Sequence, residues 1–166
     1  NDFVVLDARE ASIPLTPEAI ARLADRRRGV GFDQLVVIEP ADAGADARLR
    51  FFNPDGGEAG ACGNATRCVG RLLMLEQDRH ELVLETRGGR LAARRRPDGL
   101  VTVEMATPKL AWDEIPLASP CDTLAVPIDV AGLARPVAVN MGNPHAVFFV
   151  PDLEAIDVVR LGPELE

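Results

Sequence analysis

Cysteine is the residue type in this chain best suited to reactive chemistry, and Cys62 has the most distinctive surroundings of the three cysteines. It follows an apolar segment at 49–52 and a glycine-dense loop, and the pattern places it in the first turn of a helix. Backbone N–H groups there lack intrahelical partners and form the positive end of the helix dipole. That setting favours thiolate over thiol, so Cys62 is a candidate nucleophile or general base. The same N–H groups can bind a carboxylate of a substrate.

His145, in the segment Gly142-Asn143-Pro144-His145 between two predicted strands, is the second candidate. One interpretation is structural: the ring hydrogen-bonds a carbonyl of its own loop. The other is catalytic: the imidazole exchanges protons with a thiol across a cleft, or tunes that thiol. The residues alone leave both interpretations open. His80, next to Glu81, is predicted to lie on the surface.

Several other reaction types lack the residues that they need. Lys109 is the only lysine and lies in a proline-rich segment, which argues against a pyridoxal phosphate Schiff base. The chain has no Gly-Lys-Ser/Thr phosphate loop and no Gly-x-Gly-x-x-Gly dinucleotide motif. Its two histidines are too far apart in sequence to form a zinc cluster. We therefore expect no cofactor and no metal.

Composition limits which binding partners and which cellular compartment we expect for this chain. A net charge of −8 and a pI of about 4.8 argue against nucleic acid. Three cysteines in a chain of 166 residues do not form a disulfide framework, which indicates a reducing, cytoplasmic setting. No apolar run reaches the length of a membrane span and no signal peptide is recognisable. The expected partner is a small molecule.

Hydrophobic periodicity predicts the elements that must position Cys62. In the first two thirds of the chain we expect strands at 3–8, 35–38, 49–52, 81–86, 90–96 and 100–105, and helices at 17–28 and 65–77. Gly63 or Asn64 is expected to cap the second helix. Cys68 falls on the expected inner stripe of that helix and is predicted to be a core residue.

The triplet Arg26-Arg27-Arg28 falls in the last turn of the first predicted helix, where cations suit the helix dipole. We interpret it as a solvated helix end, with an anion site as the alternative.

A proline-rich stretch at 107–120 predicts a boundary between two domains, 1–107 and 108–166. In the second we expect strands at 124–130, 137–141, 146–150 and 158–161. An asparagine precedes an outgoing strand both at Asn1 and at Asn143, which indicates two similar domains facing each other. The chain opens on a strand without Met and stops where a helix begins, so we expect it to be part of a longer protein.

Several motifs together resemble one family, diaminopimelate epimerase, in the order in which that family has them. They are Asn1-Asp2-Phe3, Phe32-Asp33-Gln34, Phe52-Asn53-Pro54-Asp55-Gly56, Ala61-Cys62-Gly63-Asn64-Ala65-Thr66-Arg67-Cys68 and Asn140-Met141-Gly142-Asn143-Pro144-His145. The resemblance spans the whole chain. Ala65 is a mild departure, since the family usually has Gly there.

The resemblance implies an α+β fold: a mixed, barrel-like β-sheet domain wrapped around a central helix, with a second pseudo-symmetric domain only partly present. It also implies a cofactor-independent isomerase of lysine biosynthesis that converts LL-2,6-diaminopimelate to meso-diaminopimelate and assembles as a homodimer. One cysteine, matched by Cys62, takes the α-proton, and a second returns a proton from the opposite face. His145 matches the histidine beside the cysteines. The positions that match substrate-binding residues are Asn1, Gln34, Asn53, Gly63, Asn64 and Asn143.

The second catalytic cysteine of the resembled family has no match, since neither Cys68 nor Cys121 has its sequence context. We therefore expect these 166 residues to be inactive alone. Two alternatives stay open: a proline or hydroxyproline racemase of the same fold, or a non-catalytic protein that binds an amino acid. The racemases tend to have His where this chain has Asn64.

Overall fold

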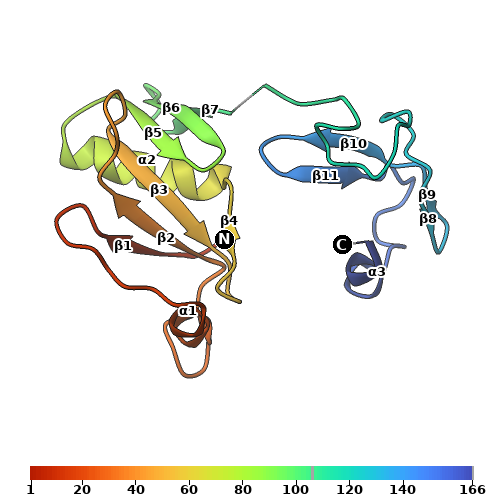
Figure 1. Cartoon of the computed structure of the whole chain (residues 1–166), viewed down its shortest axis with the longest axis horizontal. Helices are drawn as coiled ribbons and strands as arrows, with labels where there is room; N and C mark the ends of the chain where they lie inside the picture. The colour runs from red at the N-terminus through yellow and green to blue at the C-terminus, as the bar shows by residue number, and fades with distance from the viewer. Residues whose placement is uncertain (106, 166) are drawn as a thin grey trace. The chain divides into compact units, whose positions relative to one another are not determined.

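The structure is a computed structural model that describes residues 1–105 and 107–165. The chain divides into two compact units, Asn1–Ala106 and Thr107–Glu166, and each is described by itself (Figure 1). Within the described residues, no helix has both the length and the apolar character needed to cross a membrane.

The first unit is built on a seven-stranded mixed sheet in the order β1-β2-β3-β5-β6-β7, with the short β4 paired to β3 (Figure 1). β1 pairs parallel to β2 and β3 pairs parallel to β5, whereas the remaining pairs are antiparallel. The strands are β1 (Phe3–Asp7), β2 (Gln34–Glu39), β3 (Ala47–Phe52), β4 (Glu58–Ala59), β5 (Glu81–Thr86), β6 (Gly89–Arg95) and β7 (Val101–Glu104).

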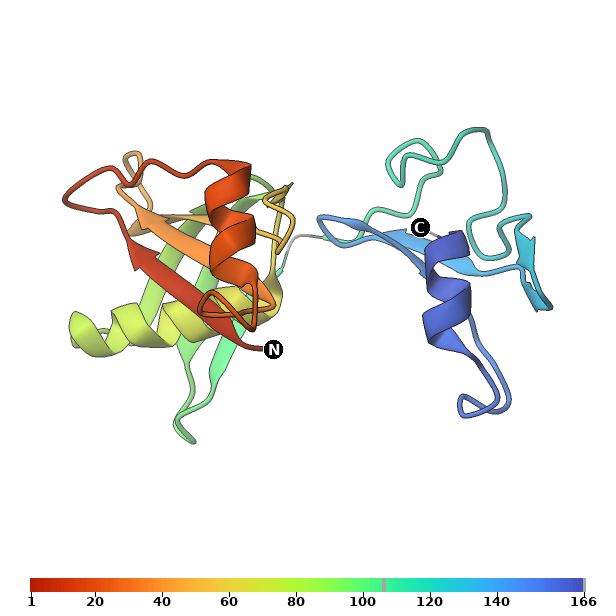
Figure 2. The same ribbon diagram turned by 90° about the horizontal axis from the view of Figure 1, so that it is seen from below.

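Two helices, α1 (Pro17–Ala24) and α2 (Gly63–Glu76), cover opposite faces of this sheet (Figure 2). Successive residues of a strand point to opposite faces. In β2, Val36 and Ile38 pack into the core cluster that contains α2, whereas Leu35 and Val37 pack into the cluster that contains α1. Covered on both faces, the middle of β2 is entirely buried, which explains its unbroken apolar run.

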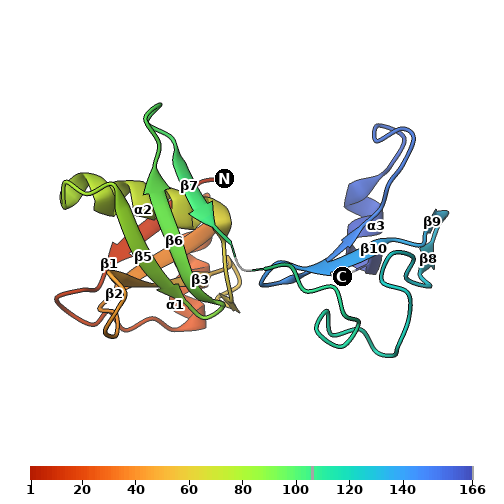
Figure 3. The same cartoon turned by 90° about the horizontal axis from the view of Figure 1, so that it is seen from above.

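α2 lies against β5, β6 and β7, and its inner face corrects one prediction (Figure 3). The buried side chains of the helix are Ala65, Thr66, Val69, Gly70, Leu73 and Met74. Cys68 is exposed, so its predicted place in the core is wrong. At about 100° per residue, Cys68 lies roughly 150° around the helix from the middle of that face. The face that packs is defined by three pairs of adjacent residues, 65–66, 69–70 and 73–74, and not by the apolar residues alone.

The second unit contains two small antiparallel sheets and one helix. Its elements are β8 (Asp129–Val130), β9 (Leu133–Ala134), β10 (Val137–Asn140), β11 (Pro144–Val147) and α3 (Val158–Leu165). Its buried core cluster consists of Ile115, Val126 and Ala138, with Leu117 and Cys121 packed against it. The α+β class predicted from the sequence is confirmed, with a mixed sheet and few helices.

Three strand predictions in this unit need correction. The strand predicted at 158–161 is wrong, because the segment forms the helix α3. Directly before it, the Asp157 side chain accepts the N–H of Arg160 and the Asp157 carbonyl accepts the N–H of Leu161. Such side-chain capping outweighs the strand preference of two adjacent valines. Of the strand predicted at 124–130, only Asp129–Val130 is extended in a sheet, since Pro127 cannot donate to a ladder. The strand predicted at 146–150 is instead Pro144–Val147.

Candidate active site

The sheet register brings three chain segments to one end of the first unit. Phe3 at the start of β1 pairs with Gln34 at the start of β2, and Leu35 pairs with Phe52 at the end of β3. Residues just before β1 and just after β3 therefore flank Gln34. Asn53 directly follows β3 and Asn1 lies two residues before β1, and the Gln34 amide nitrogen donates a hydrogen bond to Asn53 Oδ1 at 3.2 Å.

Cys62 is the N-cap residue of α2, with an extended backbone (φ −148°, ψ 105°). Its Sγ accepts a hydrogen bond from the backbone N–H of Ala65 at 3.4 Å. Its carbonyl accepts both the N–H of Thr66 at 2.9 Å and the Thr66 hydroxyl at 2.7 Å. The expectation that Gly63 or Asn64 caps the helix is wrong, because sulfur takes the place that a serine or aspartate oxygen usually has.

These contacts fix the sulfur in an electropositive position. Cys62 is half-buried, packs against the main core cluster of the unit and is a free cysteine. Ala65 and Thr66 donate to the cap, which leaves the N–H groups of Gly63 and Asn64 as first-turn donors without an acceptor among the described residues. A carboxylate placed at this helix end would meet two free N–H groups beside the sulfur.

Asn64 joins the helix end to the strand end, since its amide nitrogen donates to Asn1 Oδ1 at 2.8 Å. Five of the predicted substrate-binding positions thus lie together with Cys62 at one end of the first unit. They are Asn1, Gln34, Asn53, Gly63 and Asn64.

Asp2, Asp33 and Arg26 form a cluster beside Asn1 that the sequence did not reveal. Arg26 lies beyond the end of α1 and donates to both oxygens of Asp2 (2.8 and 2.9 Å) and to Asp33 (2.9 Å). The hydrogen bond from Arg26 holds the pKa of Asp2 well below its usual range. Arg26 therefore forms ion pairs within the unit and is not only the solvated helix end that we expected. One sequence signal for this cluster was present in the Phe32-Asp33-Gln34 motif, where an acidic residue directly precedes the candidate binding residue Gln34.

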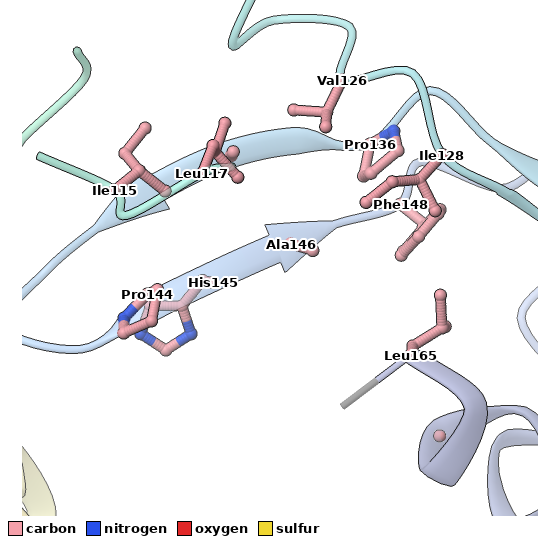
Figure 4. Close-up of a pocket in the computed structure, with 12 residues that line it drawn as sticks. Ile115, Leu117, Val126, Ile128, Pro136, Pro144, His145, Ala146, Phe148 and Leu165 are labelled. Atoms are coloured by element: carbon pink, nitrogen blue, oxygen red, sulfur yellow. The ribbon is translucent and has the colours of Figure 1, made fainter. Parts of the chain in front are cut away.

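Asn143 and His145, the remaining predicted site residues, belong to the second unit. The β10–β11 hairpin carries both, and His145 Nε2 lies 3.0 Å from Asn143 Oδ1. The oxygen of an amide only accepts, so this contact requires the proton on Nε2. His145 also lines a largely apolar cavity of about 560 Å³ with Ile115, Val126 and Phe148 (Figure 4). The ring makes its contact with Asn143 within its own hairpin.

The fold is shared with racemase-like isomerases. A solved structure described as a probable proline racemase from Agrobacterium radiobacter K84 with bound carbonate matches 88% of this chain and 42% of its own, with a TM-score of 0.57 and 21% identity. At that identity the likeness concerns the fold alone.

Sequence comparison gives the family. The diaminopimelate epimerase of Rhodospirillum centenum is 53% identical, over 100% of this chain and 57% of that protein. That of Acidiphilium cryptum is 51% identical, over 100% of this chain and 60% of that protein. The family model described as diaminopimelate epimerase matches residues 1–111. The chain belongs to the diaminopimelate epimerase family, and it spans a little under two thirds of the length of these relatives.

Proposed function

We propose that this chain contributes the first catalytic half of an epimerase that interconverts LL-2,6-diaminopimelate and meso-diaminopimelate without a cofactor. Cys62 exchanges a proton with the substrate α-carbon on one face, and a second cysteine, outside these 166 residues, acts on the other face. The substrate is an amino-diacid, and the enzyme works as a homodimer in lysine biosynthesis.

The single observation that supports this proposal best is Cys62 at the N-cap of α2. Removing a proton from the α-carbon places negative charge on the adjacent carboxylate. The N–H groups of Gly63 and Asn64, which have no acceptor among the described residues, offer that charge two donors, and the Ala65 N–H donates to the sulfur that must take the proton. General acid–base catalysis by a positioned side chain typically contributes about 10²–10⁴-fold in rate.

His145 and Asn143 complete the proposal from the second unit. His145 tunes a cysteine or relays a proton, and Asn143 binds an amino-acid end of the substrate. His145 Nε2 and Asn143 Oδ1 are in contact, so changing either residue would also free the polar group of the other.

The decisive experiment follows deuterium incorporation at the α-carbon of diaminopimelate in full-length protein. Cys62→Ala should reduce exchange by about 10²-fold or more. Cys68→Ala is the matched control, because that thiol lies on the same helix but is exposed on its other side, and it should exchange like wild type. Equal exchange by wild type and Cys62→Ala would remove Cys62 from the mechanism.

The same assay separates the alternatives. Exchange at the α-carbon of proline or hydroxyproline, and none with diaminopimelate, would favour a racemase of the same fold. Saturable binding of diaminopimelate with no exchange into either substrate would favour a binding protein.

A further inference from the structure

Four polar side chains form a continuous chain of hydrogen bonds across the candidate site. Asn1 donates from Nδ2 to Asp33 Oδ2 at 3.1 Å and accepts at Oδ1 from Asn64 Nδ2 at 2.8 Å. Asn64 in turn accepts at Oδ1 from the guanidinium of Arg67, one helical turn further along α2. The series therefore runs carboxylate, amide, amide, guanidinium.

The two ends of this series have opposite and unambiguous chemistry. A carboxylate only accepts hydrogen bonds and a guanidinium only donates them, whereas an amide can do either according to which way its terminal group is turned. With Asp33 at one end, the Asn1 nitrogen must face Asp33 and its oxygen must face Asn64. With Arg67 at the other end, the Asn64 oxygen must face Arg67 and its nitrogen must face Asn1. Reversing either amide would oppose two donors or two acceptors.

We propose that Asp33 and Arg67 are positioning residues that set the orientation of the Asn1 and Asn64 amides, and through them the polarity of the substrate site. This inference rests on the proposed function, since Asn1 and Asn64 are proposed substrate-binding residues. The orientation leaves one N–H of each amide nitrogen without an acceptor among residues 1–105 and 107–165, which suits an acceptor such as a substrate carboxylate.

Asp33 is itself held firmly enough to act as an anchor. Its Oδ1 accepts from Arg26 at 2.9 Å, and its Oδ2 accepts from the backbone N–H of Asp2 at 3.1 Å as well as from Asn1. The Asp33 N–H donates to Asp2 Oδ1 at 2.8 Å. Charge-assisted bonds of this kind are stronger than those between neutral groups, so turning the Asn1 amide would disturb a network that is already satisfied.

The test compares variants that differ in donor and acceptor character and little in size, all in full-length protein. Either end alone fixes both amides, so the test variant is the double substitution Asp33→Asn with Arg67→Gln, which replaces both one-way groups with amides that can donate or accept. The matched control is Asp33→Asn with Arg67→Lys, since an ammonium also only donates. We expect kcat/KM for α-proton exchange to fall roughly ten- to a hundred-fold in the double amide variant, because misplaced binding groups cost that much. The control should stay within about threefold of the wild-type kcat/KM.

A second readout reports the amide orientation directly and requires no activity. In protein labelled with ¹⁵N and ¹³C, a scalar coupling through the hydrogen bond should connect Asn64 Nδ2 to Asn1 Cγ. We expect this coupling in wild type and in the control with Asp33→Asn and Arg67→Lys, and its loss in the double variant with Asp33→Asn and Arg67→Gln, at unchanged helix content.

The outcomes divide clearly. Coupling in the reverse sense, from Asn1 Nδ2 to Asn64 Cγ, would overturn the proposal, and so would equal losses of kcat/KM in the double variant with Arg67→Gln and the control with Arg67→Lys. Lower melting temperature with unchanged kcat/KM per folded molecule would show a structural role only and would overturn it as well. If wild-type protein exchanges no α-proton, the proposed function fails, while the coupling still decides the amide orientation.

Discussion

The two units of the chain differ sharply in how much apolar surface they bury. The first contains two core clusters, of twelve and seven buried residues, on the two faces of its sheet. The second contains one cluster of three buried residues. Large apolar side chains of the second unit are instead exposed, with Phe149 at 84% and Val159 at 88%.

This difference bears on how each unit holds its part of the candidate site. Cys62 is fixed by its own helix cap and by the main core of the first unit, and Asn1 and Asn64 are fixed by hydrogen bonds within that unit. Asn143 and His145 lie on an exposed hairpin, beside a cavity lined by apolar residues. The first unit therefore holds its candidate site residues against a larger buried core than the second unit offers its hairpin.

The largest expected effect separates the units physically. Residues 1–106, expressed alone, should unfold in one cooperative transition, because both faces of the sheet carry a buried core. Residues 107–166, expressed alone, should show no cooperative transition, because a core cluster of three residues cannot offset the chain entropy lost on folding. Urea titration followed by circular dichroism measures both. A sigmoidal transition in 107–166 would contradict the contrast.

A matched pair of phenylalanines gives the next largest effect. Phe51 is fully buried in β3, so Phe51→Ala should lower the free energy of unfolding by about 3–5 kcal/mol. Phe149 is 84% exposed, and Phe149→Ala should change the free energy of unfolding by about 0.5 kcal/mol or less. Chemical denaturation of the 166-residue chain, followed by fluorescence and circular dichroism, gives both values. A comparable loss in the two variants would mean that the second unit is as well packed as the first.

The sequence predicted the first unit far better than the second, and the reason is the same difference in burial. The strands expected at 35–38, 49–52 and 81–86 appear with ends shifted by no more than two residues. Each of these strands has one or two buried faces, so the pattern of apolar residues along it reflects its structure. In the second unit, with little burial, the pattern carries less information, and a local cap at Asp157 turned an expected strand into a helix.

The candidate site was predictable only in its residue types. Cys62 and the amides follow from motifs, but nothing in a linear sequence states that Arg26 reaches Asp2, 24 residues away, or that Asn64 reaches Asn1, 63 residues away. Such contacts depend on the parallel pairing of β1 with β2 and on where α2 begins. Arg67 is the exception, because its spacing of three from Asn64 on a helix predicts a contact.

The smallest expected effect concerns ion pairs, and it again contrasts the units. Arg9 joins two elements of the first unit, since its Nη2 lies 2.6 Å from Asp7 at the end of β1 and 3.0 Å from Glu76 at the end of α2. Arg160 and Glu164 of the second unit pair at 3.7 Å within α3 alone. The hydrogen bond from Arg9 lowers the pKa of Asp7 to about 2. Both pairs are largely exposed, so solvent screening limits each to about 1 kcal/mol or less.

The sign of the pH dependence follows from the direction of that shift. A carboxyl group whose pKa is lower in the folded than in the unfolded state stabilises the fold above its unfolded pKa, about 3.9, and this contribution disappears as the pH falls through the folded value. Arg9→Met should therefore lower the free energy of unfolding slightly at pH 6, and should lose less stability than wild type between about pH 4 and pH 2. Arg160→Met should leave that acid slope unchanged, because it does not touch Asp7. Urea titrations across this range measure the slopes. Identical slopes in wild type and Arg9→Met would mean that the Arg9 ion pair with Asp7 contributes nothing to acid stability, and that packing rather than this pair holds β1 to α2.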